Sequence, residues 1–560
     1  MRLVQFAIFL VVTTVAAGLA LGPEAGTRAG VAGFTVDTTL DDPDNSLVDG
    51  LCDTGEGVCS LRAAVQQLNA YGGTHTITVP AGTYSLSFGA AGEDAAATGD
   101  LDLTANNLRI SGAGAGVTII QKSGGLSTHR VFDVISGTHT INNVTIQNGL
   151  GDGGNGGGIR VANNTSLTLN NVMVTGNIAT GVGGGVLNSG TLNVNDSMIT
   201  LNNAAGVAGE GGGIGNGGTA TISESTVSFN FAGSLGGGLN NLGGTLNVLR
   251  STLKGNQTGG GVGAGIRNRF GAVTLVNSTV SGNVNNGGLS NFQADTTITN
   301  STIVGNGGGG VISIDGTGVT IRNTILSGNA GGSCSGGVTS SGYNIDDGNS
   351  CAFTAPGDQP NTNPQIGPLQ NNGGPTETHD LFNTSPAIDS GNPAYPGSGG
   401  DACPAYDQRG VHRPVEGDGL GLPECDIGAV EYCVAGADPD GDGFTGGCDN
   451  CPNVANSGQI ESDGDLAGDD CDAAGLGNVD CNNAVNSVDA LKVLRYSAGL
   501  SVTQNEPCID IGTMFLIGGL MGDVDCLTAV NSVDALKILR AVAGLSVSQG
   551  PGCPPVIPKP

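Results

Sequence analysis

The chain has 560 residues, a formal net charge of −30, 102 glycines and no tryptophan. This length predicts several domains. The acidity excludes a protein that binds nucleic-acid phosphates, and it favours one that binds divalent cations.

The first 20 residues have the pattern of an export signal. Arg2 precedes an apolar run at residues 3–17, and small residues follow up to Ala20. This pattern predicts a secretory signal peptide at residues 1–20, with an uncleaved membrane anchor as the alternative. No other stretch is long and apolar enough to span a bilayer. We therefore expect a mature chain without a membrane span, either secreted or held at the cell surface.

A capping helix is predicted at residues 59–69, just before the first strand. Ser60 can cap this helix, and Leu61, Val65 and Leu68 share one of its faces. A helix at this place would cover the open end of a stack of strands and prevent edge-to-edge aggregation.

A short repeat organises residues 156–329. Each copy begins with a glycine-rich turn and an apolar residue, and the intervals between copies are 27, 28, 25, 27, 23 and 22 residues. The apolar residues are Ile159, Val186, Ile214, Leu239, Ile266, Leu289 and Val311. An asparagine closes each copy, at Asn177, Asn202, Asn230, Asn256, Asn283, Asn306 and Asn329. A repeat whose loops vary while its strands keep register indicates a solenoid.

Each copy contains a strand with apolar residues two positions apart, as in Leu167 and Leu169. The slot two positions later holds Asn171, Asn277, Asn300 and Asn323, and in other copies Asp196, Glu224 and Arg250. Stacked asparagines can hydrogen-bond to the coils above and below. The sequence therefore predicts a mainly β fold, a right-handed parallel β-helix of the pectin-lyase-like type. Less regular strands near residues 76–79, 101–103, 108–110 and 117–120 extend it towards the N-terminus.

Motifs at both ends of this region resemble one family. The Cys-Ser-Leu-Arg run at residues 59–62 resembles the Cys-Ser-Leu-Arg-Glu-Ala segment that opens a family of secreted bacterial β-helix proteins, although Ala63 stands where the family has Glu. Residues 363–376, 385–389, 407–414 and 425–431 resemble the closing region of that family. The resemblance implies a β-helix domain at residues 31–432 with a C-terminal cap at residues 333–432. The family has no defined activity. We interpret Asp389, Asp407, Arg409 and Arg413 as a salt-bridged cap rather than a catalytic cluster.

Residues 433–473 alternate carboxylates with glycines. Aspartates supply oxygen ligands for a hard cation, and glycines let the loop fold around it. The Asp-Asn-Cys-Pro run at residues 449–452 and the Gly-Asp-Asp-Cys-Asp run at residues 468–472 resemble the thrombospondin type 3 repeat. This resemblance implies calcium ligation by Asp438, Asp440, Asp442, Asp463, Asp465 and Asp469. Leu466 and Ala467 replace the usual glycine-containing turn. An acidic disordered linker is the alternative.

An internal duplication occupies the last module, residues 474–560. Residues 484–495 return as residues 529–540, and each copy joins a twelve-residue loop to an amphipathic helix. Read as EF-hand-like loops, the first offers calcium ligands at Asn478, Asp480, Asn482, Asn486 and Asp489. The second offers Asp523, Asp525, Asn531 and Asp534, while Leu527 occupies a ligand position that it cannot serve.

Paired units of this kind resemble a dockerin. The resemblance implies calcium-dependent docking onto a cohesin-type partner through Ser487, Val488, Lys492, Arg495, Ser532, Val533, Lys537 and Arg540. An insertion near Cys508 makes the repeat longer than is usual in that family. A calcium-stabilised cap that binds no partner is the alternative.

The fourteen cysteines indicate disulfides in an exported chain. Local pairs are expected at Cys52 with Cys59, Cys334 with Cys351, Cys403 with Cys425, Cys481 with Cys508, and Cys526 with Cys553. Cys433, Cys448, Cys451 and Cys471 form a further group in which the pairing is open. Disulfides are favoured over zinc there because no histidine lies nearby.

Catalytic residues are harder to identify in the repeat. Glycoside hydrolysis needs two carboxylates at close range, and only Asp196 and Glu224 share a slot in adjacent copies.

Three hypotheses for the function follow. The first is a secreted calcium-binding scaffold or surface protein with a non-catalytic β-helix and a carbohydrate or cell-surface ligand. The second is a polysaccharide lyase or glycoside hydrolase delivered by its dockerin. The third is an adhesin.

Overall fold

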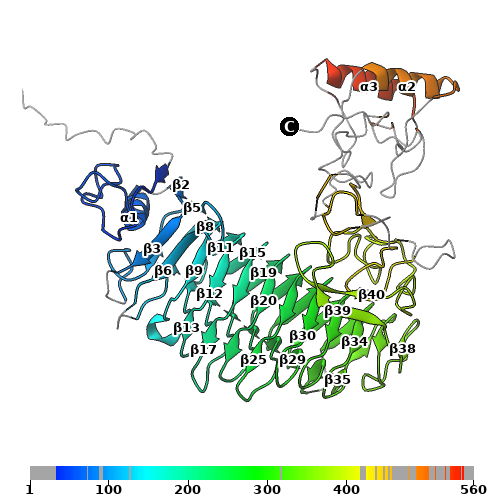
Figure 1. Cartoon of the computed structure of the whole chain (residues 1–560), viewed down its shortest axis with the longest axis horizontal. Helices are drawn as coiled ribbons and strands as arrows, with labels where there is room; N and C mark the ends of the chain where they lie inside the picture. Colours follow the sequence, from blue (N-terminus) through cyan, green and yellow to red (C-terminus); the bar gives the residue numbers. More distant parts are fainter. Residues whose placement is uncertain are drawn as a thin grey trace, which may run out of the picture.

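A computed structural model describes residues 33–71, 73–87, 92–124, 128–315, 318–415, 424–434, 438–444, 448–451, 454–456, 459, 479, 487–502, 511, 522, 524, 530–543, 545 and 547. Within these ranges the chain forms a long rod of stacked β-strands, with one helix at its N-terminal end and two helices in the C-terminal module (Figure 1). The described strands of the rod are joined in parallel, so the predicted parallel β-helix is confirmed. The signal peptide falls outside the described residues.

Three long sheets form the faces of the rod. The first sheet contains β1 (Gly33–Thr35), β2 (Thr74–Val79), β5 (Asn107–Gly112), β8 (Thr138–Asn142), β11 (Ser166–Asn170), β15 (Thr191–Asn195), β19 (Thr219–Ser223), β23 (Thr245–Leu249), β27 (Ala272–Val276), β30 (Asp295–Thr299), β33 (Val319–Arg322) and β36 (Thr339–Ser340). The second contains β3 (Gly82–Leu86), β6 (Thr118–Lys122), β9 (Thr145–Gln147), β12 (Met173–Thr175), β16 (Met198–Thr200), β20 (Thr226–Ser228), β24 (Thr252–Lys254), β28 (Thr279–Ser281), β31 (Thr302–Val304), β34 (Ile325–Ser327), β37 (Ile345–Asp346) and β38 (Gln359–Pro360).

The third sheet contains β4 (Leu101–Leu103), β7 (Phe132–Val134), β10 (Ile159–Val161), β14 (Val186–Asn188), β18 (Ile214–Asn216), β22 (Leu239–Leu242), β26 (Ile266–Arg269), β29 (Leu289–Phe292), β32 (Val311–Ser313) and β35 (Cys334–Ser335). A short fourth sheet contains β13 (Ile178–Ala179), β17 (Asn203–Ala204), β21 (Phe231–Ala232) and β25 (Gln257–Thr258). A 3-10 turn, η1 (Asp152–Gly154), lies in the loop before β10.

Alternating apolar residues fill the interior of the rod. In β11, Leu167 and Leu169 point inwards and are fully buried, and they pair in register with Leu192 and Val194 of the next coil. Because side chains alternate between the two faces of a strand, the same two positions of every coil form a continuous apolar column. This stacking gives the rod one long core.

The asparagine that closes each repeat forms a buried ladder. Asn202 accepts hydrogen bonds from the backbone N–H and the side-chain amide of Asn177, at 3.1 and 3.0 Å. Asn202 in turn donates to Asn230 at 3.0 Å and to the Val174 carbonyl at 2.9 Å. The same pattern continues to Asn329. A buried side-chain amide is stable only when its donors and its acceptor are all hydrogen-bonded. The regular stacking of the coils provides these hydrogen-bond partners for each asparagine.

From β8 to β33, the residue that follows each strand of the first sheet is a corner with left-handed backbone. Its asparagines have φ between 43° and 56°, while Asp196, Glu224 and Arg250 have φ of 48°, 51° and 48°. Asparagine tolerates this conformation better than other residues with a Cβ atom. Asp196, Glu224 and Arg250 therefore occupy, at three successive corners, a backbone conformation that is filled by asparagine at the other corners of this series.

A helix, α1 (Leu61–Tyr71), covers the N-terminal end of the rod (Figure 1). It begins two residues later than predicted because the Ser60 hydroxyl caps it, accepting from the Ala63 N–H at 3.0 Å. Leu61, Val65 and Leu68 are buried as expected. Arg62 is buried as well, in an ion pair with Asp41 at 2.8 Å.

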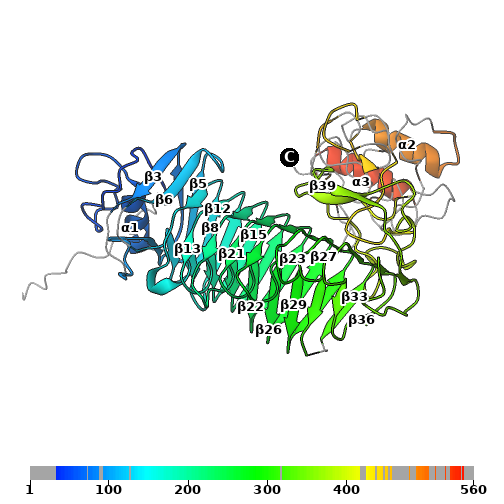
Figure 2. The same ribbon diagram turned by 60° about the horizontal axis from the view of Figure 1, so that its bottom comes forward.

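Residues 366–415 and 424–432, which we name the return segment, lie along the side of the rod rather than only at its end (Figures 1 and 2). The segment contains an antiparallel hairpin, β39 (Ile366–Gln370) and β40 (Thr378–Leu381). Thr252 of β24 donates to the Glu377 carbonyl at 2.6 Å, and Thr279 of β28 donates to Gln408 at 2.7 Å. The segment thus covers the outer face of the second sheet from β24 towards the C-terminus.

The return segment has a charged interior. Buried Arg409 pairs with Asp407 at 2.9 Å, and buried Arg413 pairs with Glu431. Asp389 accepts a hydrogen bond from the backbone of Glu424. The ion pairs of Arg409 and Arg413 are thus of the kind expected from the sequence.

Disulfides join three of the expected local pairs, Cys52–Cys59, Cys334–Cys351 and Cys403–Cys425. In the group of four with open pairing, Cys433 bonds to Cys448. Cys451 is also disulfide-bonded. Cys471, Cys481, Cys508, Cys526 and Cys553 lie outside the described residues.

The described residues of the last module include two helices, α2 (Ser487–Ser497) and α3 (Ser532–Val542). They share a small core with Val493 and Ile538 at its centre. An asparagine–aspartate capping box begins α3: Asn531 accepts from the Val533 N–H at 2.8 Å, and Asp534 accepts from the Asn531 N–H at 2.8 Å.

Candidate functional site

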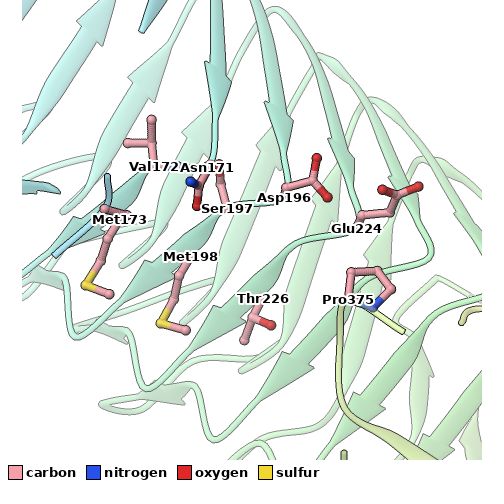
Figure 3. Close-up of a pocket in the computed structure, with 10 residues that line it drawn as sticks. Asn171, Val172, Met173, Asp196, Ser197, Met198, Glu224, Thr226 and Pro375 are labelled. Carbon is pink, nitrogen blue, oxygen red and sulfur yellow. Dashed lines mark hydrogen bonds between the residues drawn. The ribbon is translucent and has the colours of Figure 1, made fainter. Parts of the chain in front are cut away.

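A pocket of about 220 Å³ lies on the rod beside the connection between β39 and β40. Met173, Met198 and Thr226 are the first residues of three adjacent strands of the second sheet, and their side chains line its floor (Figure 3). Asp196 and Glu224 project from the neighbouring corners, and Pro375 closes one side (Figure 3). The predicted carboxylate pair is therefore brought together in one surface pocket.

The two carboxylates of this pocket have different environments. Glu224 forms an ion pair with Arg250, the next corner residue along the rod. Burial raises the pKa of Asp196, and the charge of Arg250 opposes that rise. Two carboxyl groups in one pocket, one of them with a pKa raised by burial, are an arrangement that acid–base chemistry can use. The other described residues that line the pocket carry no acid or base.

The predicted calcium loop at residues 438–442 is partly formed. Oxygen atoms of Asp438, Asp440 and Asp442 all lie within 4.8 Å of one another. Asp438 accepts from the backbone N–H groups of Gly441 and Gly443 at 2.7 and 3.1 Å, which curls the loop around the carboxylates. These residues fit the oxygen ligand set that calcium prefers. The other three predicted ligands, Asp463, Asp465 and Asp469, lie outside the described residues.

The two EF-hand-like loops are described only at their ends. Asp489 and Asp534 occupy equivalent places in the first turns of α2 and α3, and both are fully buried. Asn531 is half-buried at the start of α3. The remaining predicted ligands, Asn478, Asp480, Asn482, Asn486, Asp523 and Asp525, lie outside the described residues.

An apolar surface recurs on α2 and α3. Residues 487–495 and 532–540 share the same burial class position by position, in keeping with their duplicated sequence. The exposed aliphatic side chains are Val488, Leu491 and Leu494 on α2, and Val533, Leu536 and Leu539 on α3, with exposed fractions between 39% and 57%. The residues of both helices that face their shared core are different ones, such as Val493 and Ile538.

The predicted partner-binding residues lie around this surface. Val488 and Val533 belong to it, and Ser487, Ser532, Arg495 and Arg540 are exposed beside it. Lys492 and Lys537 are half-buried at equivalent positions. Sequence reasoning missed the leucines, Leu491, Leu494, Leu536 and Leu539, although apolar residues outside the buried stripe of each amphipathic helix were a usable signal.

Comparison with known proteins identifies related folds. Among solved structures, the chain is similar to the pectate lyase Pel9A, with 16% identity and a TM-score of 0.44 over 72% of this chain and 98% of that one. It is also similar to the A-modules of two Azotobacter vinelandii mannuronan C-5 epimerases. AlgE6 has 18% identity and a TM-score of 0.32 over 53% of this chain and 86% of its own, and AlgE4 has 18% and 0.30 over 55% and 88%.

No protein-family model and no curated protein match the chain. Among the described residues, no helix is long and apolar enough to cross a membrane.

Proposed function

We propose that this chain is a secreted, modular, calcium-binding β-helix protein whose C-terminal helices dock the rod onto a cohesin-type protein. The observation that carries the proposal is the exposed apolar surface repeated on α2 and α3. Fully burying an aliphatic side chain is worth about 1.5–3 kcal/mol. Three half-exposed ones on each helix would contribute several kcal/mol to a complex that covers them.

Charge supports a protein partner with an acidic rim. Four of the 19 Lys and Arg residues of this acidic chain stand on these two eleven-residue helices: Lys492, Arg495, Lys537 and Arg540. The surface of α2 and α3 has an apolar centre and basic neighbours. It is complementary to a partner surface whose apolar patch is surrounded by carboxylates. The repeat of the same residues on both helices provides two equivalent docking faces.

Calcium and export fit the same proposal. Buried carboxylates at Asp489 and Asp534 stand where the twelfth position of each loop would coordinate calcium, between docking residues of the same helix. Loss of calcium would therefore disturb the helices themselves. The four described disulfide bonds suit an oxidising compartment outside the cytoplasm.

The test is calorimetric titration of the full chain into a set of cohesin-type modules, with calcium or with EDTA. We expect saturable 1:1 binding by at least one module in calcium and none in EDTA. Leu242→Asp, which changes an exposed leucine on the rod, is the matched control and should bind normally. Absence of binding across the set, or binding that survives EDTA, contradicts the proposal.

A second candidate function rests on the pocket of Asp196 and Glu224. The two carboxylates line one surface pocket, Glu224 pairs with Arg250, and burial raises the pKa of Asp196. This arrangement favours glycoside hydrolysis or lyase chemistry on a polysaccharide. The assay measures reducing ends and unsaturated products released from plant and microbial polysaccharides. Turnover that is lost in Asp196→Asn and in Glu224→Gln, but kept in Asp295→Asn on the exposed side of the rod, would establish this function.

A further inference from the structure

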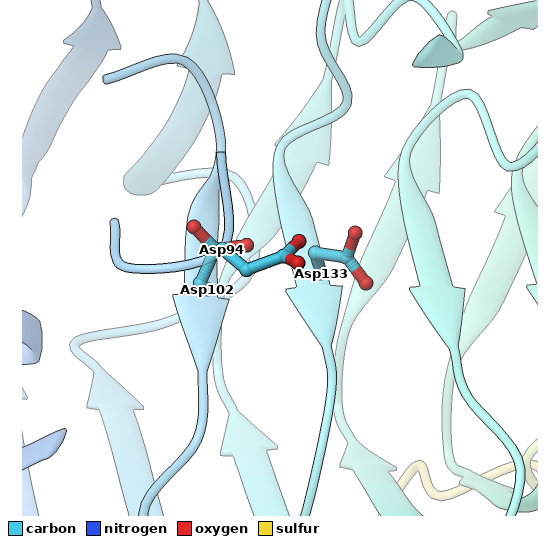
Figure 4. Close-up of side chains that lie close together, drawn as sticks. All are labelled: Asp94, Asp102 and Asp133. Carbon is cyan, nitrogen blue, oxygen red and sulfur yellow. The ribbon is translucent and has the colours of Figure 1, made fainter. Parts of the chain in front are cut away.

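A group of aspartates lies at the N-terminal end of the third sheet, far from the predicted calcium loops. Asp102 of β4 and Asp133 of β7 stand directly opposite each other in the parallel pairing. The loop at residues 92–100 brings Asp94 to the same place, so that oxygen atoms of all three lie within 4.8 Å of one another (Figure 4). Neighbouring strands and a loop thus converge on one point.

The charges around this point do not balance. A cavity of about 330 Å³ beside it is lined by Glu93, Asp94, Asp100, Asp133 and Asp152, with Arg130 and Arg160 as its basic residues. With Asp102, six carboxylates face two guanidinium groups, which leaves a formal charge of −4. Like charges at such distances repel strongly unless a cation or protons compensate them.

Asp102 is the member of the group whose charge is least compensated. Asp133 accepts from Arg130 at 2.5 Å and from Arg160 at 2.7 Å, and Asp100 pairs with Arg130 at 3.2 Å. Asp102 is fully buried, yet one of its oxygens has only the Ala96 N–H, at 2.6 Å, and the other has no hydrogen-bond partner. A buried carboxylate with an unpartnered oxygen is costly, so a ligand or a proton must satisfy it.

We propose that Asp94, Asp102 and Asp133 bind a calcium ion. The donor set consists of carboxylate oxygens alone, which favours a hard cation over zinc or copper. The irregular geometry, with ligands from two strands and a loop, suits calcium better than magnesium, which demands a regular octahedron. The unpartnered oxygen of Asp102 would become a ligand, and the excess negative charge would fall by two.

The bound calcium ion would stabilise the contact between α1, the helix at the N-terminal end, and the rod. Arg62 of α1 donates to the carbonyls of Ala96 and Gly99 in the same loop, at 2.9 and 2.7 Å. Gln66 of α1 also donates to the Ala96 carbonyl, at 3.0 Å. Calcium on Asp94 would hold this loop against β4 and β7, and through the loop it would hold α1 over the open end of the strands.

The test is hydrogen–deuterium exchange of the full chain, read by mass spectrometry in peptides that cover residues 92–104, with calcium chloride or EDTA. We expect calcium to slow exchange there at least tenfold in the wild type. Asp102→Asn and Asp94→Asn should each remove the effect. Asp295→Asn, on the rod, and Asp438→Asn, in the predicted calcium loop, are controls that should keep it.

Exchange at residues 92–104 that calcium does not change in the wild type would overturn the proposal. So would a calcium effect that persists in both Asp102→Asn and Asp94→Asn. If Asp102→Asn fails to fold, Asp94→Asn decides alone, because Asp94 is an exposed loop residue and its substitution leaves the core intact.

Discussion

The buried asparagine ladder should be a main source of stability in the rod, and Asn230→Ala tests this. The side chain of Asn230 makes four hydrogen bonds. Its oxygen accepts from the backbone and side chain of Asn202, both at 3.0 Å, and its nitrogen donates to the Ile199 carbonyl at 2.9 Å and to Asn256 at 3.0 Å. Asn230 is fully buried, so water cannot replace these partners. At roughly 1 kcal/mol for each bond, the substitution should cost about 4 kcal/mol.

Asn195→Ala is the matched control for this prediction. Asn195 is half-buried in β15 and its side chain makes one hydrogen bond, to Asn170 at 2.9 Å. Its loss should cost about 1 kcal/mol. The assay is equilibrium urea unfolding of the full chain in calcium, followed by circular dichroism of the β signal. A difference of less than about 1 kcal/mol between the two variants would refute the account of the ladder.

Two further predictions concern pH and calcium. Burial lowers the pKa of His379, whose Nε2 lies 2.9 Å from the Ser281 hydroxyl of β28 and whose Nδ1 lies 2.8 Å from the Gly367 carbonyl. The unfolded state then binds more protons just below the ordinary histidine pKa of 6.5, so stability should fall as pH drops below about 6.5, and urea unfolding of His379→Gln should show a weaker decline. Removal of calcium with EDTA should speed amide exchange in α2 and α3 at least tenfold. Exchange in the central coils from β11 to β27 should not change. Equal exchange in α2 and α3 with and without EDTA would count against calcium ligation by Asp489 and Asp534.

The regular part of the molecule could be predicted because it repeats. The interval between closing asparagines placed Asn230 in register with the coils on either side, and the shared slot placed Asp196 beside Glu224. The hydrogen-bonded ladder itself was predicted for the corner asparagines such as Asn171, not for Asn230. Both placements follow from strand register, which a period in the sequence reports directly.

The irregular parts could not be predicted in the same way. The return segment reaches Thr252 from Glu377 and Thr279 from Gln408, across 125 and 129 residues, and no period in the sequence records such contacts. Asp102 and Asp133 lie before the regular repeats, and Asp94 joins them through a loop whose path depends on buried Arg62. Contacts of this kind arise from tertiary packing rather than from local pattern.

The most direct test of the docking function compares the two helices within one chain. The full chain is titrated in calcium into the cohesin-type module that it binds, as wild type, as Leu491→Asp, as Leu536→Asp and as the double variant. Because the two faces are equivalent, each single variant should retain one face and weaken binding only about twofold, whereas the double variant should weaken it more than about 100-fold. A double variant that binds as tightly as the wild type would contradict the proposal that these faces dock the protein.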